Sequence, residues 1–266
     1  MAIRTIFSMA EDCARGQRQG WHEFVRDYAG IARALLTHYF PTLAAEVDEH
    51  VVAVFHRAGH NGASWFAGLK LTNEREFMMA FRDLVFAYGR EQERVPAPPI
   101  SLDQVRAVMK GLTLLERELL WLVIKGYDSA RIATIMMNAA ATAEAVHRTA
   151  SERHALGPRG AAGLPVLATP VLMELAEQAK TEKCASLKTF NNLVNGQITW
   201  RDREQAEEHM NNCFYCIDRF TTFQEMVRLR KDVPPLSKPQ VEAVLAKLPV
   251  AAGKPSGTLS RLFAGR

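Results

Sequence analysis

Apolar residues recur every three or four positions through most of the first 95 residues, which is the spacing of amphipathic α-helices. One such stretch lies in residues 10–40 and is stopped by Pro41, and two more begin at Val47 and Glu74. Glycines in residues 59–62 predict a turn after the second stretch. The apolar faces comprise Trp21, Phe24, Val25, Tyr28, Ile31, Ala32, Leu35, Leu36, Val47, Val51, Val54, Phe55, Phe77, Met78, Phe81, Leu84, Val85 and Tyr88.

The middle of the chain continues as shorter helices after a proline-rich break. Residues 93–101 contain three prolines, which predict a linker because proline cannot continue a helix. Capping boxes beginning at Ser101 and Thr113 each predict a helix start, and Asp128 predicts the cap of a short helix. A further helix is expected over 142–154. This order is typical of a helix-turn-helix and also of a plain three-helix bundle.

The last third of the chain predicts a small helical domain between two irregular stretches. Residues 155–170 are rich in glycine and proline and predict a flexible linker. Helices are expected over 171–180, 220–230 and 238–248. The sequence therefore predicts an all-α protein. Its parts are a first helical domain at 1–95, a helix-turn-helix domain at 96–156, a linker at 157–170, a small domain at 171–232 and a tail at 233–266.

The composition predicts a protein of the cytoplasm. The chain is 48% hydrophobic, which is enough to form buried cores, and its four cysteines are too few for a disulfide framework. The N-terminal residues lack the apolar core of a signal peptide, and no apolar run is long enough to span a membrane. Residues 226–266 hold eight Lys and Arg against two Asp and Glu. This basic tail could contact DNA or a polymerase, or serve only as a solubilising terminus.

Three of the four cysteines lie in one window together with a histidine at the spacing of a metal site. His209-x3-Cys213-x2-Cys216 places the histidine one helical turn from a pair of thiolates, and Cys184 is the remaining cysteine nearby. These four residues predict a zinc site. The alternatives are that Cys213 and Cys216 are small buried hydrophobes, and that His147 or His154 supplies the fourth ligand.

The stretch 184–216 resembles the zinc-binding domain of anti-sigma factors. That family has an H-x3-C-x2-C motif, preceded by a turn such as the one at 195–199 and by an acidic helix such as the one carrying Glu204, Glu207 and Glu208. The family's remaining ligand lies about two dozen residues before the motif histidine, where this chain has Cys184. The resemblance implies a structural or redox-sensing zinc bound by Cys184, His209, Cys213 and Cys216.

Residues 10–154 resemble an extracytoplasmic-function sigma factor. The similarity lies in the opening helix around Trp21, the acidic run 45–55, the run 114–126 at the start of the helix-turn-helix, and the pairs Ile132-Ala133 and His147-Arg148. The resemblance implies RNA polymerase core and promoter DNA as partners. It implies polymerase contacts at Glu46, Asp48, Glu49 and Phe55, and DNA contacts at Thr142, His147, Arg148 and Arg153.

The chain departs from the sigma family in charge. The family's recognition helix is basic, whereas residues 138–154 carry two arginines and two glutamates. The helix that would melt the minus-ten element, 74–94, carries four arginines against five acidic residues. Because affinity for DNA depends largely on Lys and Arg at phosphates, we expect weak promoter binding.

Two functions follow as expectations. The first is a sigma-factor-like regulator of transcription initiation whose fused zinc domain holds the sigma domains in cis and masks their polymerase-binding faces. The long linker at 157–170 would make that docking intramolecular. The alternative is a zinc-dependent sequestering or sensing module that has lost strong promoter recognition. We do not expect an enzyme, because the sequence contains no phosphate loop, nucleophile elbow or paired carboxylates, and a closed Cys3His site has no open position for water.

Overall fold

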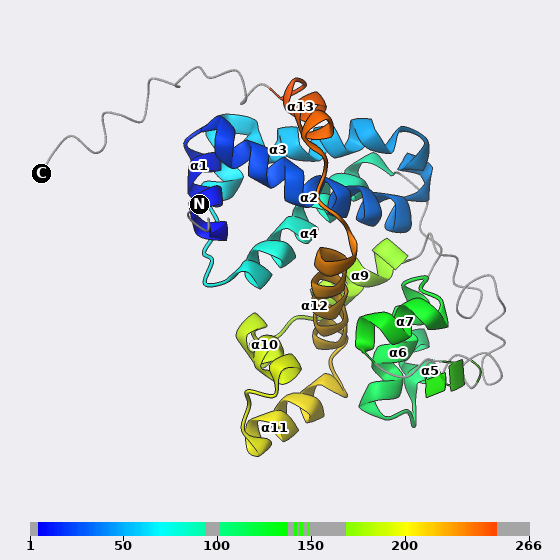
Figure 1. Cartoon of the computed structure of the whole chain (residues 1–266). Coiled ribbons are helices and arrows are strands. Elements are labelled where there is room, and N and C mark those ends of the chain that lie inside the picture. Colours follow the sequence, from blue (N-terminus) through cyan, green and yellow to red (C-terminus); the bar gives the residue numbers. More distant parts are fainter. Residues whose placement is uncertain are drawn as a thin grey trace, which may run out of the picture. The chain divides into compact units, whose positions relative to one another are not determined.

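The computed structural model describes residues 5–93, 102–137 and 169–248, together with positions 141, 142, 144, 145 and 148. All regular structure in these residues is helical, and they contain no strand (Figure 1). The all-α prediction is therefore confirmed. No described helix has the combination of length and apolar character that crossing a membrane requires.

The two longest of the described helices, α2 and α3, lie in the first half of the chain. The first half contains α1 (Ile6–Ala14), α2 (Arg18–Tyr39), the 3-10 helix η1 (Pro41–Glu46), α3 (Val47–Ala67) and α4 (Glu74–Gln92). The second contains α5 (Leu102–Met109), α6 (Leu114–Ile124), α7 (Ser129–Met136), α9 (Thr169–Gln178), α10 (Leu187–Asn195), α11 (Trp200–Met210), α12 (Phe214–Asp232) and α13 (Lys238–Leu245).

The chain forms two compact units, and the first is built from both ends of the sequence. It contains residues 1–92 and 230–266, whereas the second contains residues 93–229. The stretches predicted as separate domains at 96–156 and 171–232 thus fall largely in one unit. Residues 157–168 of the linker predicted at 157–170 lie outside the described residues, and its last two residues belong to α9 (Thr169–Gln178). The tail from 249 onward and the proline-rich stretch 94–101 also lie outside the described residues.

The core of the first unit is organised around the ring of Phe24 in the middle of α2. Its centroid lies 4.6 Å from that of Phe55, 5.1 Å from Phe66 and 5.4 Å from Phe81. These rings come from α3 and α4, so one residue of α2 contacts both neighbouring helices. Aromatic pairs at these separations stabilise a core beyond the area that they bury.

The C-terminal residues 230–248, here called the C-terminal arm, pack against α2 (Figure 1). The Leu236 N–H donates to the carbonyl of Arg26 at 2.8 Å, and Val241 is fully buried. Gly30 makes the close approach possible, since a Cβ at this position would lie 2.6 Å from Cγ1 of Val233. The arm therefore completes the first unit by covering one side of α2.

The second unit has one hydrophobic core shared by α5, α6, α7, α9 and α12. Trp121 and Leu122 of α6 are fully buried in it, and the ring of Phe214 from α12 stacks on Trp121 with a centroid separation of 5.8 Å. The helix-turn-helix-like stretch and the small C-terminal domain are therefore not separate cores, because α12 and α9 supply part of the apolar surface that buries α6.

Local sequence signals account for the helix starts at Thr113 and Asp128, and one predicted turn is wrong. Thr113 and Glu116 form the predicted capping box, and the Asp128 side chain accepts from the Arg131 N–H at 2.7 Å.

The turn expected at 59–62 does not form, because α3 continues from Val47 to Ala67. Glycine disfavours a helix interior by only about 1 kcal/mol. Burial of apolar residues on both sides of these glycines, such as Val54 and Phe66, outweighs that preference.

Candidate metal centre

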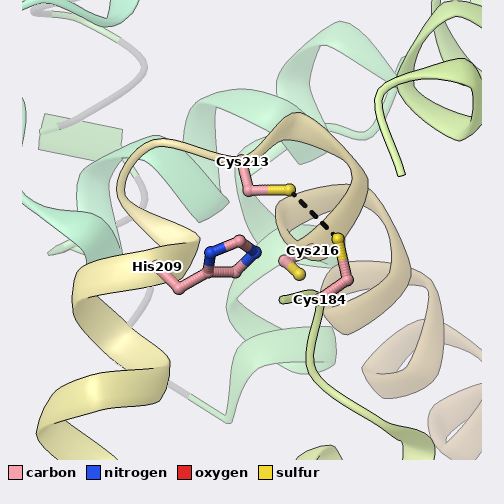
Figure 2. A group of neighbouring side chains, drawn as sticks. All are labelled: Cys184, His209, Cys213 and Cys216. Atoms are coloured by element: carbon pink, nitrogen blue, oxygen red, sulfur yellow. Dashed lines mark hydrogen bonds between the residues drawn. The ribbon is translucent and has the colours of Figure 1, made fainter. Parts of the chain in front are cut away.

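Four side chains predicted as metal ligands are brought together by three different parts of the second unit (Figure 2). Cys184 lies in the turn between α9 and α10, and His209 lies in the last turn of α11. Cys213 directly precedes α12, and Cys216 lies in its first turn. Residues far apart in the sequence thus meet at the point where α11 ends and α12 begins.

The geometry of the cluster fits a single metal ion. The ligand atoms of Cys184, His209, Cys213 and Cys216 all lie within 4.8 Å of one another. The Sγ atoms of Cys184 and Cys213 are 3.6 Å apart, and Figure 2 shows the imidazole of His209 directed toward the sulfur atoms. The cluster could therefore hold a metal ion through three sulfurs and one nitrogen.

The burial and hydrogen bonding of the His209 imidazole support a role as a metal ligand. Its Nε2 atom is buried and has no hydrogen-bond partner among the described residues. A buried polar nitrogen without a partner is costly unless another group or ion satisfies it. A metal ion bound between His209 and the three cysteines would do so, whereas packing of small hydrophobic cysteines would not.

The three thiols differ in how readily they ionise. Burial raises the pKa of both Cys213 and Cys216. Burial also acts to raise the pKa of Cys184, but hydrogen bonds from the Thr181 N–H and hydroxyl oppose it and bring this pKa down to about 7. The Thr181 nitrogen lies 3.2 Å from the Cys184 sulfur. Cys184 is therefore the thiol most readily available as a thiolate, the form that binds metals.

Two of the helices beside the Cys3His cluster, α10 and α11, bury little apolar surface of their own. Phe190 is the only buried residue of α10, and Met210 is the only one of α11. In contrast, α12 buries residues along most of its length. The position of α10 and α11 thus depends on contacts near the four ligands far more than the position of α12 does.

A second polar cluster, which the sequence did not predict, joins α6 to α12. Lys125 is 0% exposed, and its Nζ lies 3.0 Å from Oδ1 of Asp218, 2.7 Å from Oγ1 of Thr222 and 4.0 Å from Oε2 of Glu225. The indole N–H of Trp121 also donates to Oδ1 of Asp218 at 3.0 Å. We call this group the Lys125 network. One buried cation therefore lies beside two buried carboxylates.

The sequence contains two signals for the Lys125 network. Lys125 directly follows the apolar run 119–124. Asp218, Thr221 and Glu225 follow one another at helical spacing on α12, and all of them are buried. A polar stripe along a helix normally faces solvent. Either signal alone is compatible with a solvent-exposed position. Only when the two are considered together do they indicate that Lys125 meets the polar residues of α12 in the interior.

Glu118 is a second buried ionisable group of α6, 6% exposed. Its carboxyl has no hydrogen-bond or ion-pair partner among the described residues. Burial, with a smaller contribution from the charge of Glu207, raises the pKa of Glu118 to about 8. Glu118 therefore carries its proton at neutral pH in the folded chain.

Replacing Glu118 by Gln should stabilise the protein above pH 5 and alter its pH dependence. In the unfolded chain this carboxyl ionises near its usual pKa of 4.5, while in the folded chain it stays protonated to about pH 8. The folded state then binds more protons over that interval, so wild-type stability falls as pH rises, by up to about 1.4 kcal/mol per pH unit. Urea unfolding from pH 5 to pH 8 should give a shallower decline for Glu118→Gln. Parallel declines in the two proteins would contradict the assignment.

The residues predicted to contact a polymerase do not share one environment. Glu46, Asp48 and Glu49 are exposed at the end of η1 and the start of α3, and Asp48 forms an ion pair with Arg33. Phe55 is completely buried against Phe24. The three acidic residues are accessible to a partner, whereas Phe55 contributes to the core that holds α3 in place.

The residues predicted to contact DNA are only partly described. Thr142 and Arg148 are helical and exposed. His147 and Arg153 lie outside the described residues, and so does His154, which was considered with His147 as an alternative metal ligand. Among the described residues, Cys184 is the fourth candidate ligand beside His209, Cys213 and Cys216.

No family model, curated protein or solved structure matches this chain.

Proposed function

We propose that this protein is a sigma-factor-like regulator of transcription initiation, with RNA polymerase core and promoter DNA as partners and a zinc-bearing C-terminal part that acts on it in cis. The observation that carries the proposal is the Cys3His cluster, which stands at the ligand positions of the anti-sigma zinc motif and joins directly onto α12. The same helix packs on α6 of the helix-turn-helix-like stretch.

Zinc is the metal that we propose for the cluster. Three sulfur ligands and one imidazole are the donor set of structural zinc, and Zn–S bonds of roughly 2.3 Å arranged as a tetrahedron place sulfurs roughly 3.8 Å apart. The separation of 3.6 Å between Cys184 and Cys213 is close to that value. With four protein ligands the zinc would have no open position for water, so we propose that it is structural or redox-sensing and that the protein is not an enzyme.

Action in cis is supported by two separate contacts of the C-terminal part. The Lys125 network holds α12 against α6, the first helix of the helix-turn-helix-like stretch. In the other unit, the C-terminal arm covers α2. Glu242 of the arm pairs with Arg18 of α2, and Arg230 pairs with Glu74 at the start of α4. Both sigma-like stretches thus carry a contact from residues that follow the helix-turn-helix.

The proposal predicts that releasing the C-terminal arm increases capture of the core polymerase. Val241→Asp places a charge at a fully buried position of the arm, whereas Ala243→Asp places the same charge at an exposed position of the same helix. Co-purification with untagged bacterial core polymerase should recover severalfold more polymerase with Val241→Asp than with the wild type or Ala243→Asp. Failure of all three proteins to capture polymerase would overturn the proposed partner, and equal capture would overturn masking by the arm.

A second candidate function is a sequestering or sensing module that no longer reads promoters. The neutral charge of residues 138–154 favours it. If phosphates are contacted by few cations, the logarithm of DNA affinity should fall with the logarithm of salt concentration along a shallow slope. A salt titration of the full chain on promoter fragments measures this slope, and Arg148→Ala should reduce it by about one if Arg148 contacts a phosphate. Steep salt dependence would exclude the second candidate.

A further inference from the structure

The second unit contains a pocket that neither the metal centre nor the Lys125 network uses. Its volume is about 510 Å³, within the range of pockets that hold small organic molecules. The lining comes from α6 and the end of α7 on one side and from α10, α11 and α12 on the other. The pocket therefore lies where the helix-turn-helix-like stretch meets the helices around the metal centre.

Two hydrogen-bonding groups in the lining have no hydrogen-bond partner among the described residues. One is the carboxyl of Glu118 from α6. The other is Oε1 of Gln224 from α12, which is inaccessible to solvent and accepts no hydrogen bond. Such groups raise the free energy of the folded state unless something satisfies them. Both can accept hydrogen bonds from a donor placed in the pocket.

The remaining walls are mainly apolar and include Met136, Met210 and Phe220. Methionine side chains adapt readily to ligands of different shape. The charged residues of the lining other than Glu118 are Arg203 and Glu207 of α11, which form an ion pair with each other at 2.7 Å. The pocket thus combines an apolar surface with one carboxyl group that has no cationic partner.

The backbone at the edge of the pocket is unusual. Met137 lines it and has φ 53°, the left-handed conformation that is uncommon for residues with a side chain. Residues held in this conformation often occur at functional sites. Met137 and the two unpartnered acceptors of Glu118 and Gln224 thus line the same pocket.

We propose that this pocket binds a small organic amine, with the amine at Glu118 and Gln224 and an apolar body against the methionine and phenylalanine side chains. An ammonium group supplies the N–H donors that both acceptors lack, and its charge pairs with a Glu118 carboxylate. This site is independent of the proposed contacts with polymerase and DNA.

Binding of the amine is expected to release a proton from Glu118. The amine enters as an ammonium ion, and the protonated carboxyl of Glu118 releases its proton to solvent, leaving a carboxylate beside the ammonium. The pair in the pocket is then neutral overall, and one proton is released for each ligand bound. A neutral or anionic ligand of the same shape produces no such release.

The test uses three probes that share one apolar body: 4-phenylbutylamine, 4-phenylbutanol and 4-phenylbutyrate. Isothermal titration of the full chain at pH 7 should show saturable binding of the amine at one per chain, at least tenfold tighter than binding of the alcohol or the acid. Titrations in buffers of different ionisation enthalpy should show up to one proton released with the amine. Glu118→Gln should weaken amine binding at least tenfold, abolish the proton release and leave alcohol binding unchanged.

Two further variants complete the experiment. Glu208→Gln removes an exposed acidic group from the same helix as Glu207 but outside the pocket, and it should bind the amine like the wild type. Gln224→Leu removes the second acceptor and should weaken amine binding severalfold, while the proton release persists. Equal affinity for all three probes, no saturable binding, or unchanged amine affinity in Glu118→Gln would each overturn the proposal.

Discussion

Removing the proposed zinc is expected to melt α10 and α11 while leaving α6, α7 and α12 folded. α10 and α11 each bury a single residue, Phe190 and Met210, so the metal supplies most of what holds them. After treatment with a chelator, or in Cys216→Ser, amide hydrogens of α10 and α11 should exchange at least a hundredfold faster. That factor corresponds to about 2.8 kcal/mol of local stability.

The fourth cysteine provides the control for this experiment. Cys13 is fully buried in α1 of the first unit and takes no part in the metal cluster. Cys13→Ala should therefore keep one zinc per chain by elemental analysis and keep slow exchange in α10 and α11. Slow exchange in a metal-free wild-type protein would show that the four side chains are held by packing alone.

The ligand set was the part of the functional site most open to prediction from sequence. His209, Cys213 and Cys216 lie so close along the chain that one helix end and one turn bring them together, and this spacing is specific to metal binding. Cys184 is separated from them by two helices, so its place depended on resemblance to a family and on the absence of nearby competitors. The structure brings its sulfur to 3.6 Å from that of Cys213.

Breaking the Lys125 network should produce the largest loss of stability from any single substitution away from the metal. Lys125→Met leaves the carboxylates of Asp218 and Glu225 buried without their cation, and Asp218→Ala leaves Lys125 without its nearest carboxylate. Removing one partner of a buried ion pair typically costs about 3–5 kcal/mol. Chemical denaturation followed through amide hydrogen exchange in α6 and α12 should show losses of that order in the second unit.

A double-substitution cycle separates pairing from burial. Lys125→Met combined with Asp218→Ala removes both charges of the pair, so the double variant should be more stable than the sum of the two single losses predicts. Glu11→Ala is the surface control, since Glu11 and Arg15 form an exposed i,i+4 pair whose loss should cost less than about 0.5 kcal/mol. Additive losses in the cycle would mean that Lys125 and Asp218 do not interact.

The fold was predictable where the signal was local. Thr113 and Asp128 cap helices as their sequences indicate, and the amphipathic stripe that contains Phe24 and Phe55 forms the core of the first unit. What could not be read from the sequence is the long-range pairing. The arm packs on α2 because Gly30 leaves space for Val233, and α12 completes the core around α6. In neither case does a sequence pattern identify which segment is the packing partner.

Because the first unit is built from both ends of the chain, it cannot be completed during synthesis until the C-terminal arm has been made. The ribosome must add residues 40–237 after α2 has been made before α13 exists to cover it. At rates of about 5–20 residues per second, this interval lasts roughly 10–40 s. Throughout it, the side of α2 that the arm later covers is open in the nascent chain. Any partner that recognises this side of α2 therefore meets it first on a protein still being translated, and chains that terminate early keep that side open permanently.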